Sequence, residues 1–252
     1  MIKIFINADD FGLNPLVNSA IIELFNRNLI NSTTLMSNMP SFEEAVELAY
    51  KSHITKRIGI HLNLDEGYLL TSNNLITSLF GKENHNNSKD NRRRLFNISK
   101  DEKDLIYKEF AAQIERVKES GINITHIDTH HHIHEMWSIT KIVLALLKEY
   151  NISSMRILNN LNRATGFYKS GYRIIVNKFI IIKNANFSDF FGNQFEAIDF
   201  LKMNRTIINS KKLEIMVHPD YNENGKIIDK IKHQEYSFEY PDELAKLISM
   251  QS

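Results

Sequence analysis

The sequence of 252 residues contains no cysteine, only four prolines, nine glycines and one tryptophan. The absence of cysteine excludes disulfide bonds, thiolate zinc sites and a cysteine nucleophile, so any metal ion must bind through nitrogen and oxygen atoms. No apolar run reaches the roughly 18 residues of a membrane-spanning helix, and the N-terminus lacks the basic and apolar regions of a secretory signal. We therefore expect a soluble, cytoplasmic protein.

An excess of charge of either sign is also missing. The chain has 31 Lys and Arg against 30 Asp and Glu, which gives a formal net charge of +1. Nucleic-acid-binding domains usually carry a strongly basic face, and proteins that bind anionic membranes usually carry a cationic one. We therefore expect neither nucleic acid nor membrane as a partner. The 42% hydrophobic content is typical of a globular protein with a large core.

Apolar segments alternate with helical patterns along most of the chain. Strands are predicted at 2–7, 32–37, 57–63, 124–128, 153–158 and 213–218, and helices after Asn14 and at 41–51, 100–120, 138–150 and 241–250. Asn14 with Pro15 is typical of a helix start, and Ser41 with Glu44 predicts a capping box. The apolar run at 179–187 fits a helix or a strand. Such alternation is typical of parallel strands joined by helices.

At least six such units in about 250 residues predict an α/β protein with a (β/α) TIM-like barrel. Polar residues recur where the predicted strands end, at Asp9, His61, His130 and His218, as expected for a barrel with its site at the carboxyl ends. An open, doubly wound sheet remains the alternative. Residues 65–99 are rich in Asn and charge and predict an insertion over the site. Without internal repeats or a linker, 1–252 is expected to form a single domain.

Five of the ten histidines lie within nine residues, in the segment 126–134 (HIDTHHHIH). In an extended chain alternate residues share a face, so His126, Asp128 and His130 are expected to point the same way. Neutral imidazole is the commonest metal ligand in proteins, and a neighbouring carboxylate fixes its tautomer. The segment therefore predicts a metal site, although not all five histidines can be ligands. Histidines that only satisfy hydrogen bonds are the alternative.

Two adjacent carboxylates, Asp9 and Asp10, follow the first predicted strand, and His61 lies at the end of another. Alone, an Asp pair often caps a turn, and a single His is often a core residue. Together with His130, however, they supply two imidazoles and a carboxylate, a set that leaves coordination positions open for water and substrate. A second carboxylate can then accept a proton during metal-dependent hydrolysis.

Three segments, 7–12 (NADDFG), 58–61 (IGIH) and 126–134, resemble those of the YdjC-like carbohydrate deacetylases. The resemblance continues in matching order to 214–219 (EIMVHP) and covers essentially the whole chain. It implies a distorted (β/α) barrel that can have fewer than eight strands, and hydrolysis of the N-acetyl group of an amino sugar. It also implies a divalent metal, Mg²⁺ foremost with Zn²⁺ as the alternative.

The resemblance also implies roles for individual residues. The implied metal ligands are Asp10, His61 and His130, and the implied catalytic residues are Asp9 as base, His218 as general acid and Arg156 as partner of the base. The family often has a proline near this arginine, where Leu158 and Asn159 follow here, so an ordinary structural ion pair is the alternative for Arg156. Asp128 fits a role in orienting a ligand.

Two other classes of function remain open. Another barrel metallohydrolase, an amidohydrolase or phosphoesterase, could use His132 and His134 as a metal pair and often holds two ions. A non-catalytic protein that binds metal or sugar is the other alternative, because a fold does not entail an activity. The expected partner is a small acetylated saccharide, such as a short β-linked N-acetylglucosamine oligomer, and a homodimer is compatible with the sequence.

Overall fold

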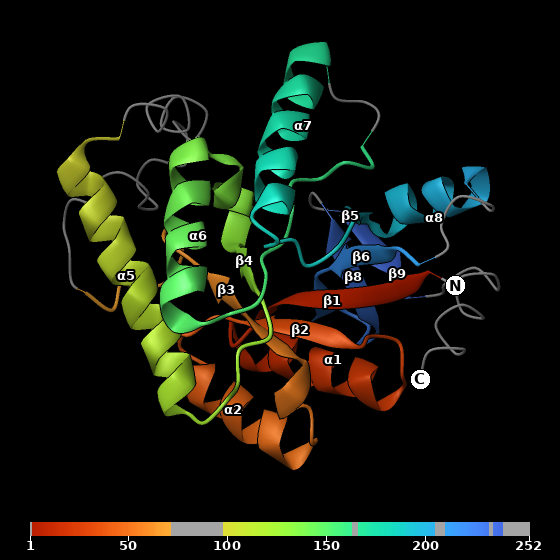
Figure 1. Ribbon diagram of the computed structural model, residues 1–252. Coiled ribbons are helices and arrows are strands. Elements are labelled where there is room, and N and C mark those ends of the chain that lie inside the picture. Colours follow the sequence, from red (N-terminus) through yellow and green to blue (C-terminus); the bar gives the residue numbers. More distant parts are fainter. Residues whose placement is uncertain (1, 72–97, 163–165, 205–209, 232–233, 239–252) are drawn as a thin grey trace.

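The computed structural model describes residues 2–71, 98–162, 166–204, 210–231 and 234–238 (Figure 1). Most of the predicted insertion at 65–99 and the predicted helix at 241–250 lie outside these ranges. Six parallel strands form the main sheet in the order β4-β3-β2-β1-β6-β5. Their bounds are β1 (Lys3–Phe11), β2 (Ser32–Leu35), β3 (Ile58–Leu62), β4 (Ile127–Thr129), β5 (Phe190–Asn193) and β6 (Lys212–Val217).

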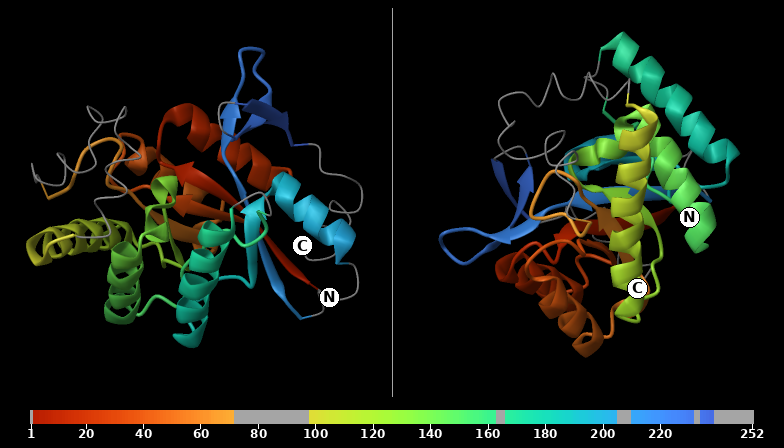
Figure 2. Two further views of the ribbon diagram at one scale, coloured as in Figure 1. Left: turned by 90° about the horizontal axis from the view of Figure 1, so that it is seen from above. Right: turned by 90° about the vertical axis from the view of Figure 1, so that its left-hand side faces the viewer.

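The main sheet curls into a half-barrel with helices on its outside (Figures 1 and 2). This confirms the predicted α/β fold, a distorted TIM-like barrel with fewer than eight strands. The strands β2 and β3 are buried along their whole length, as expected for parallel strands covered on both faces. The carboxyl ends of the parallel strands therefore share one edge, where the predicted site residues lie.

The predicted strand at 153–158 forms only isolated bridges. Met155 bridges Ile127 of β4 on one side and Asn186 on the other. The segment then leaves the ladder because the Asn177 side chain accepts from the backbone N–H of Leu158 and donates to its carbonyl, both at 2.8 Å. A side-chain amide thus replaces a neighbouring strand here, which the apolar pattern could not predict.

Within the described ranges, six helices and two short 3₁₀ segments accompany these strands. Their bounds are α1 (Pro15–Asn26), α2 (Phe42–Lys51), α5 (Lys100–Glu119), α6 (Trp137–Tyr150), α7 (Phe167–Ile182), α8 (Gln194–Met203), η1 (Thr55–Arg57) and η4 (His130–Glu135). The apolar run at 179–187 ends α7 and then turns at Asn184, which has a positive φ. Among the described helices, none has the length and apolar character needed to cross a bilayer.

Helix starts show which cap predictions were right. Asn14 caps α1, since its side chain accepts from Val17 N at 3.0 Å. The capping box predicted at Ser41 and Glu44 is wrong, because Ser41 makes no cap hydrogen bond and Glu44 accepts from Asn18 Nδ2 at 2.8 Å instead. A complete capping box occurs at the start of α5, between Ser99 and Glu102, where it had not been predicted.

A second, antiparallel sheet follows β6 and was not predicted. It consists of β7 (Pro219–Tyr221), β8 (Ile227–Ile231) and β9 (Gln234–Ser237), in the order β7-β8-β9. Figure 2 shows its hairpin projecting away from the main sheet. Its residue Asp229 accepts from the backbone N–H of His218 at 2.7 Å, so this small sheet positions a predicted site residue.

Candidate metal and catalytic site

The two adjacent aspartates lie at the carboxyl end of β1, inside the strand rather than after it. The strand was predicted to end at residue 7, but it continues to Phe11 and its pairing with β2 is irregular between Ala8 and Phe11. Asp9 follows normal alternation, since Asn7 Nδ2 donates to its Oδ1 at 2.9 Å. Asp10 has a φ of 70°, and this bulge redirects a side chain that a regular strand would point to the opposite face.

Asp10, His61 and His130 converge from three different elements, β1, β3 and the start of η4. Asp10 Oδ1 lies 3.2 Å from His61 Nε2 and 3.0 Å from His130 Nδ1, and the two imidazole nitrogens are 3.3 Å apart. Both histidines are buried and Asp10 is nearly so. Three donor atoms this close, one carboxylate and two imidazoles, could hold a single metal ion.

Each of the two histidines contacts a further carboxylate through its other ring nitrogen. Asp128 Oδ1 lies 2.5 Å from His61 Nδ1, and Thr34 Oγ1 donates to the other oxygen of Asp128 at 3.0 Å. Glu66 Oε2 lies 2.9 Å from His130 Nε2. A carboxylate on one ring nitrogen orients the imidazole and leaves the other nitrogen for a metal ion, which is the usual arrangement behind histidine ligands. These contacts support the fit of the three residues to a divalent ion.

The electrostatics of the cluster favour positive charge. Burial alone would lower the pKa of His130, but Asp10 and Glu66 outweigh it and raise this pKa to about 9. Burial opposes the same shift in His61, where Asp128 and Asp10 raise the pKa well above its usual value. Burial would raise the pKa of Asp10, yet the two imidazoles hold it well below its ordinary range. The neighbouring carboxylates therefore stabilise positive charge on the two imidazoles.

Arg156 is fully buried beside this cluster and contacts three carboxylates. Its Nη1 and Nη2 donate to the two oxygens of Asp9, each at 2.7 Å, in the bidentate geometry typical of Arg–carboxylate pairs. Nη1 also lies 2.8 Å from Asp128 Oδ2, and Nε donates to Glu214 Oε1 at 2.7 Å. The predicted partnership of Arg156 with Asp9 is thus present as a direct contact.

Two carboxyl partners of the Arg156 guanidinium, Asp9 and Glu214, have pKa values shifted in opposite directions. Burial would raise the pKa of Asp9, but Arg156 outweighs burial and holds this pKa well below its usual range. For Glu214 burial dominates over Arg156 and raises the pKa to about 7. Asp9 is therefore firmly ionised at neutral pH, whereas Glu214 titrates near neutrality.

His218 follows β6 directly and lies near Asp9. Its Nε2 lies 3.9 Å from Asp9 Oδ2, and its ring is about one-third exposed. Gln194 Nε2 donates to Asp229 at 2.9 Å, which fixes the carboxylate that binds the His218 backbone. All six predicted site residues therefore lie together, four at the ends of β1, β3 and β6, His130 just after β4, and Arg156 on the bridging segment.

The remaining histidines of the segment 126–134 have protein partners of their own. His132 and His134 do not occur together in any group of potential metal ligands within the described ranges, so the alternative of a metal pair there lacks support. Their partners, and those of the other two, are Phe191 for His132, Thr129 for His134, Phe187 for His126 and Asp65 for His131.

Two carboxylates of the site were missed by the sequence analysis. Glu214 lies inside the apolar segment 213–217 (LEIMV), and a charged residue in a buried strand requires a buried partner. That mismatch was a usable signal. Glu66 lies at the start of the predicted insertion, among polar residues, and nothing in the pattern there distinguishes it.

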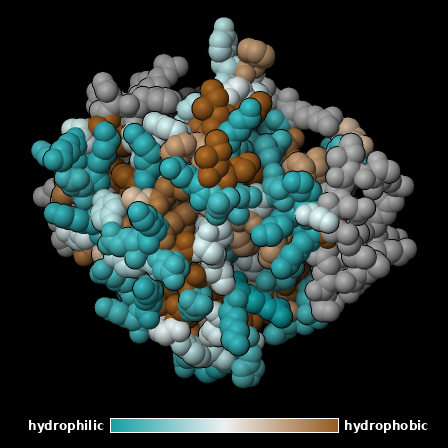
Figure 3. All heavy atoms as spheres, in the orientation of Figure 1, coloured by the Kyte–Doolittle hydropathy of each residue, from teal (hydrophilic) through white to brown (hydrophobic). Residues whose placement is uncertain are grey.

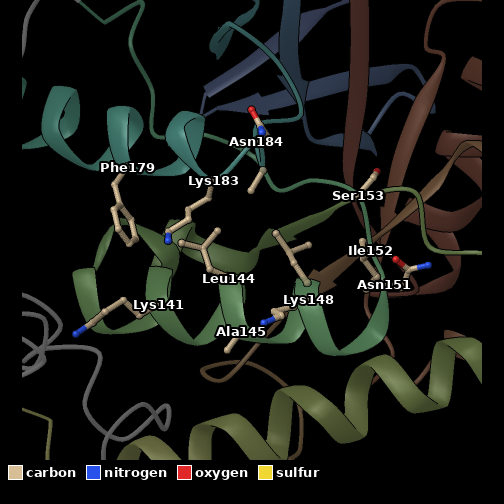
Figure 4. A pocket seen from close by; sticks show the side chains of 12 residues that line it. Lys141, Leu144, Ala145, Lys148, Asn151, Ile152, Ser153, Phe179, Lys183 and Asn184 are labelled. Atoms are coloured by element: carbon tan, nitrogen blue, oxygen red, sulfur yellow. The ribbon is translucent and has the colours of Figure 1, made fainter.

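A pocket of about 480 Å³ lies elsewhere on the molecule, between α6 and the end of α7. Figure 4 shows Lys141 and Lys148 on α6 and Lys183 after α7 around it. None of the predicted site residues lines this pocket, so it is separate from the His and Asp cluster.

Known proteins are similar to this chain in sequence and in fold. A family model described as YdjC-like protein matches residues 3–251. A carbohydrate deacetylase of Clostridium beijerinckii is 33% identical over 226 residues, which cover 87% of this chain and 82% of the relative. A carbohydrate deacetylase of Brevibacillus brevis is 33% identical over 220 residues, with the same coverage of 87% and 82%.

A solved structure from Enterococcus faecalis, described as a candidate cellobiose-phosphate cleavage protein, matches with a TM-score of 0.64. It is 24% identical, and the match covers 88% of this chain and 83% of that one, so it supports the fold alone. The family model and the two bacterial relatives confirm the resemblance seen in the motifs. This chain belongs to the YdjC-like carbohydrate deacetylase family.

Proposed function

We propose that this protein is a metal-dependent deacetylase that hydrolyses the N-acetyl group of an amino sugar or a short chito-oligosaccharide, with release of acetate. The observation that carries the proposal is the convergence of Asp10, His61 and His130 beside an ionised Asp9 and a partly exposed His218. The relatives named carbohydrate deacetylase support the reaction class. Such a site combines a place for a divalent ion with two groups that can transfer protons.

Asp10, His61 and His130 would hold the ion. A divalent ion bound there would polarise the amide carbonyl and increase the acidity of water. The family resemblance favours Mg²⁺, whereas two imidazole donors suit Zn²⁺ better, because Mg²⁺ prefers oxygen ligands. Measuring the ion content of the purified protein distinguishes the two.

We assign proton transfer to Asp9 and His218. Asp9 is ionised because Arg156 lowers its pKa, so it can accept a proton from the attacking water. Arg156 uses both oxygens of Asp9 and thereby fixes the orientation of the carboxylate. His218, with its Nε2 at 3.9 Å from Asp9 and its ring open to solvent, can donate a proton to the departing amine nitrogen.

The direct experiment incubates the metal-loaded protein with N,N′-diacetylchitobiose and follows the products by mass spectrometry. We expect acetate and a free amine. Release of monosaccharide would indicate glycosidic cleavage, and release of phosphate from a sugar phosphate would favour the phosphoesterase alternative. Turnover of a different acetylated sugar would keep the reaction class and change the substrate.

The ligand assignment has its own test, with a matched control. His61→Ala and His130→Ala are expected to lose the bound ion, as measured by elemental mass spectrometry. His53→Ala removes an exposed histidine that belongs to no group of potential metal ligands within the described residues, so this variant is expected to keep the ion. Full ion occupancy in both ligand variants would contradict the assignment, as would two ions in each wild-type chain.

A further inference from the structure

An exposed aromatic side chain lies at the same edge of the main sheet as the candidate site. Most exposed large apolar residues of the described surface belong to α7, and Figure 3 shows hydrophobic residues gathered over the position of that helix. Phe195 is an exception, because it is the second residue of α8, directly after β5. Its side chain is 42% exposed. An aromatic ring left open to solvent beside a functional site is a candidate contact for a ligand.

The strand register places Phe195 near His218. Asn193 at the end of β5 is the register partner of Met216 on β6, and neighbouring strands lie about 4.8 Å apart. Phe195 and His218 each follow their member of this pair by two residues. Phe195 therefore leaves the edge of the main sheet one strand away from the proposed general acid.

The small antiparallel sheet brings a second aromatic ring to the same place. Asp229 on β8 and Tyr236 on β9 are register partners, so their side chains share one face of this sheet. Asp229 accepts from Gln194 at 2.9 Å, and the Tyr236 ring lies 4.5 Å from the Phe195 ring at an angle of 66°. Since Asp229 also binds the backbone of His218, the aromatic pair and the proposed acid are held by one set of contacts.

A complete capping box fixes the backbone that carries Phe195. The Asn193 side chain accepts from the backbone N–H groups of Phe195 and Glu196, each at 3.0 Å. Glu196 Oε2 in turn accepts from the backbone N–H of Asn193 at 3.0 Å. A side chain on such a fixed backbone loses little conformational freedom when a ligand binds. The aromatic pair is therefore preorganised as a contact surface.

A pocket of about 380 Å³ opens beside the aromatic pair, and this volume is in the usual range of small-ligand sites. Its polar lining consists of Gln194, Asp199, Lys202 and Ser237. One acidic and one basic residue give this lining no net charge, whereas the pocket between α6 and α7 has three lysines and no acidic residue in its described lining. The pocket beside Phe195 therefore suits a neutral ligand that has hydroxyl groups and an apolar face.

We propose that this pocket is a further saccharide subsite, in which one ring of an acetylated oligosaccharide packs on Phe195 while another ring of the same chain lies at the metal cluster. The proposal rests on the proposed deacetylase function. One face of a pyranose ring presents C–H groups that pack on the negative face of an aromatic ring. The sugar hydroxyls can bond to carboxylate, ammonium, amide and hydroxyl groups such as those of the lining. The protein therefore favours oligomers over a single acetylated sugar.

The dependence of activity on chain length tests the subsite. With N-acetylglucosamine and its β-linked dimer and trimer as substrates of the metal-loaded protein, kcat/KM is expected to rise with chain length. Phe195→Leu keeps the apolar bulk but removes the ring. The KM for the trimer should then rise roughly 2- to 10-fold, as for the loss of one aromatic contact, while kcat and the KM for the monosaccharide stay unchanged.

Two further variants serve as controls. Phe195→Tyr keeps the ring and should retain the preference for the trimer. Tyr50→Leu removes an aromatic side chain of similar exposure, 48%, from the end of α2. Because α2 joins the parallel strands β2 and β3, its end lies at the opposite edge of the sheet, and this variant should behave as the wild type. Circular dichroism checks that every variant is folded.

The possible outcomes separate the subsite from the proposed function. An unchanged KM for the trimer in an active Phe195→Leu variant would overturn the subsite and leave the function intact. A rise in the KM for the monosaccharide as well would place Phe195 at the reacting ring and also overturn a separate subsite. If no acetylated sugar is turned over, the function fails, and titration calorimetry with the trimer decides the subsite. Weaker binding by Phe195→Leu than by the wild type then supports it, and equal or absent binding overturns it.

Discussion

Replacing Arg156 by methionine tests the electrostatic account of the site most directly. The guanidinium is fully buried and contacts Asp9, Asp128 and Glu214, so the substitution leaves three buried carboxyl groups without their cation. Methionine is flexible and apolar and fills much of the same volume. The main effect is therefore electrostatic rather than a cavity.

The expected loss is large compared with the stability of an ordinary protein. Removing one partner of a buried ion pair costs about 3–5 kcal/mol, because the other charge stays buried and uncompensated. Total stabilities are about 5–15 kcal/mol, so Arg156→Met is expected to lose a substantial fraction of the free energy of unfolding. The matched control is Arg27→Met, whose exposed pair with Glu23 four residues earlier is worth only about 0.3–0.5 kcal/mol.

The loss should also depend on pH in a defined direction. In the variant, Arg156 no longer opposes the effect of burial, so burial raises the pKa of Asp9 and Glu214 above their unfolded values and the folded state binds extra protons. The free energy of unfolding then falls as pH rises through that interval, and the loss at about pH 7.5 exceeds the loss at about pH 5. Urea unfolding of the wild type and the variant at both pH values measures this loss of free energy of unfolding. Equal losses at both, or a loss as small as that of Arg27→Met, would refute the account.

Three further predictions concern individual site residues. Asp9→Asn is expected to keep the bound ion in elemental analysis but to lose at least about 100-fold in turnover, since it removes the proton acceptor; loss of the ion would exchange the roles of the two aspartates. His218→Ala is expected to remove the basic limb of the pH profile of kcat/KM, because the variant lacks the side chain proposed to donate a proton to the departing amine, and a surviving limb would exclude that role. Burial raises the pKa of Glu214 to about 7. The free energy of unfolding therefore falls as the pH rises from the ordinary pKa of a glutamate toward neutrality, because the folded state must give up a proton that it binds more tightly than the unfolded state does. Glu214→Gln should therefore make the free energy of unfolding, measured in urea, depend less on pH between about pH 5 and 8. An unchanged pH dependence would contradict the raised pKa.

The barrel and the gathering of the site residues could be predicted from the sequence for one physical reason. The carboxyl ends of parallel strands meet at one edge, so Asp10, His61 and His218, far apart along the chain, had to lie near each other once the strands were identified. His130 follows from the same reasoning. The spacing of apolar residues determines strands and helices well when backbone hydrogen bonds stay within regular elements.

The prediction failed where side chains replace regular backbone pairing. Asn177 binds the backbone of Leu158 and interrupts a predicted strand, and Glu44 binds Asn18 rather than completing a capping box. In both cases the partner comes from another element, so the local pattern contains no trace of it. The continuation of β1 through a bulge escaped prediction similarly, because two aspartates at a strand end are typical of a loop.

The bulge also explains why two adjacent aspartates can have different roles. Both oxygens of Asp9 already accept hydrogen bonds from Arg156, and the fixed guanidinium charge repels a nearby divalent cation. Asp10 faces His61 and His130, whose imidazoles can lose their protons when an ion binds. A divalent ion would therefore compete with exchangeable protons at Asp10 but with a permanent cation at Asp9. This difference favours Asp10 as the ligand and leaves Asp9 as the carboxylate available for proton transfer.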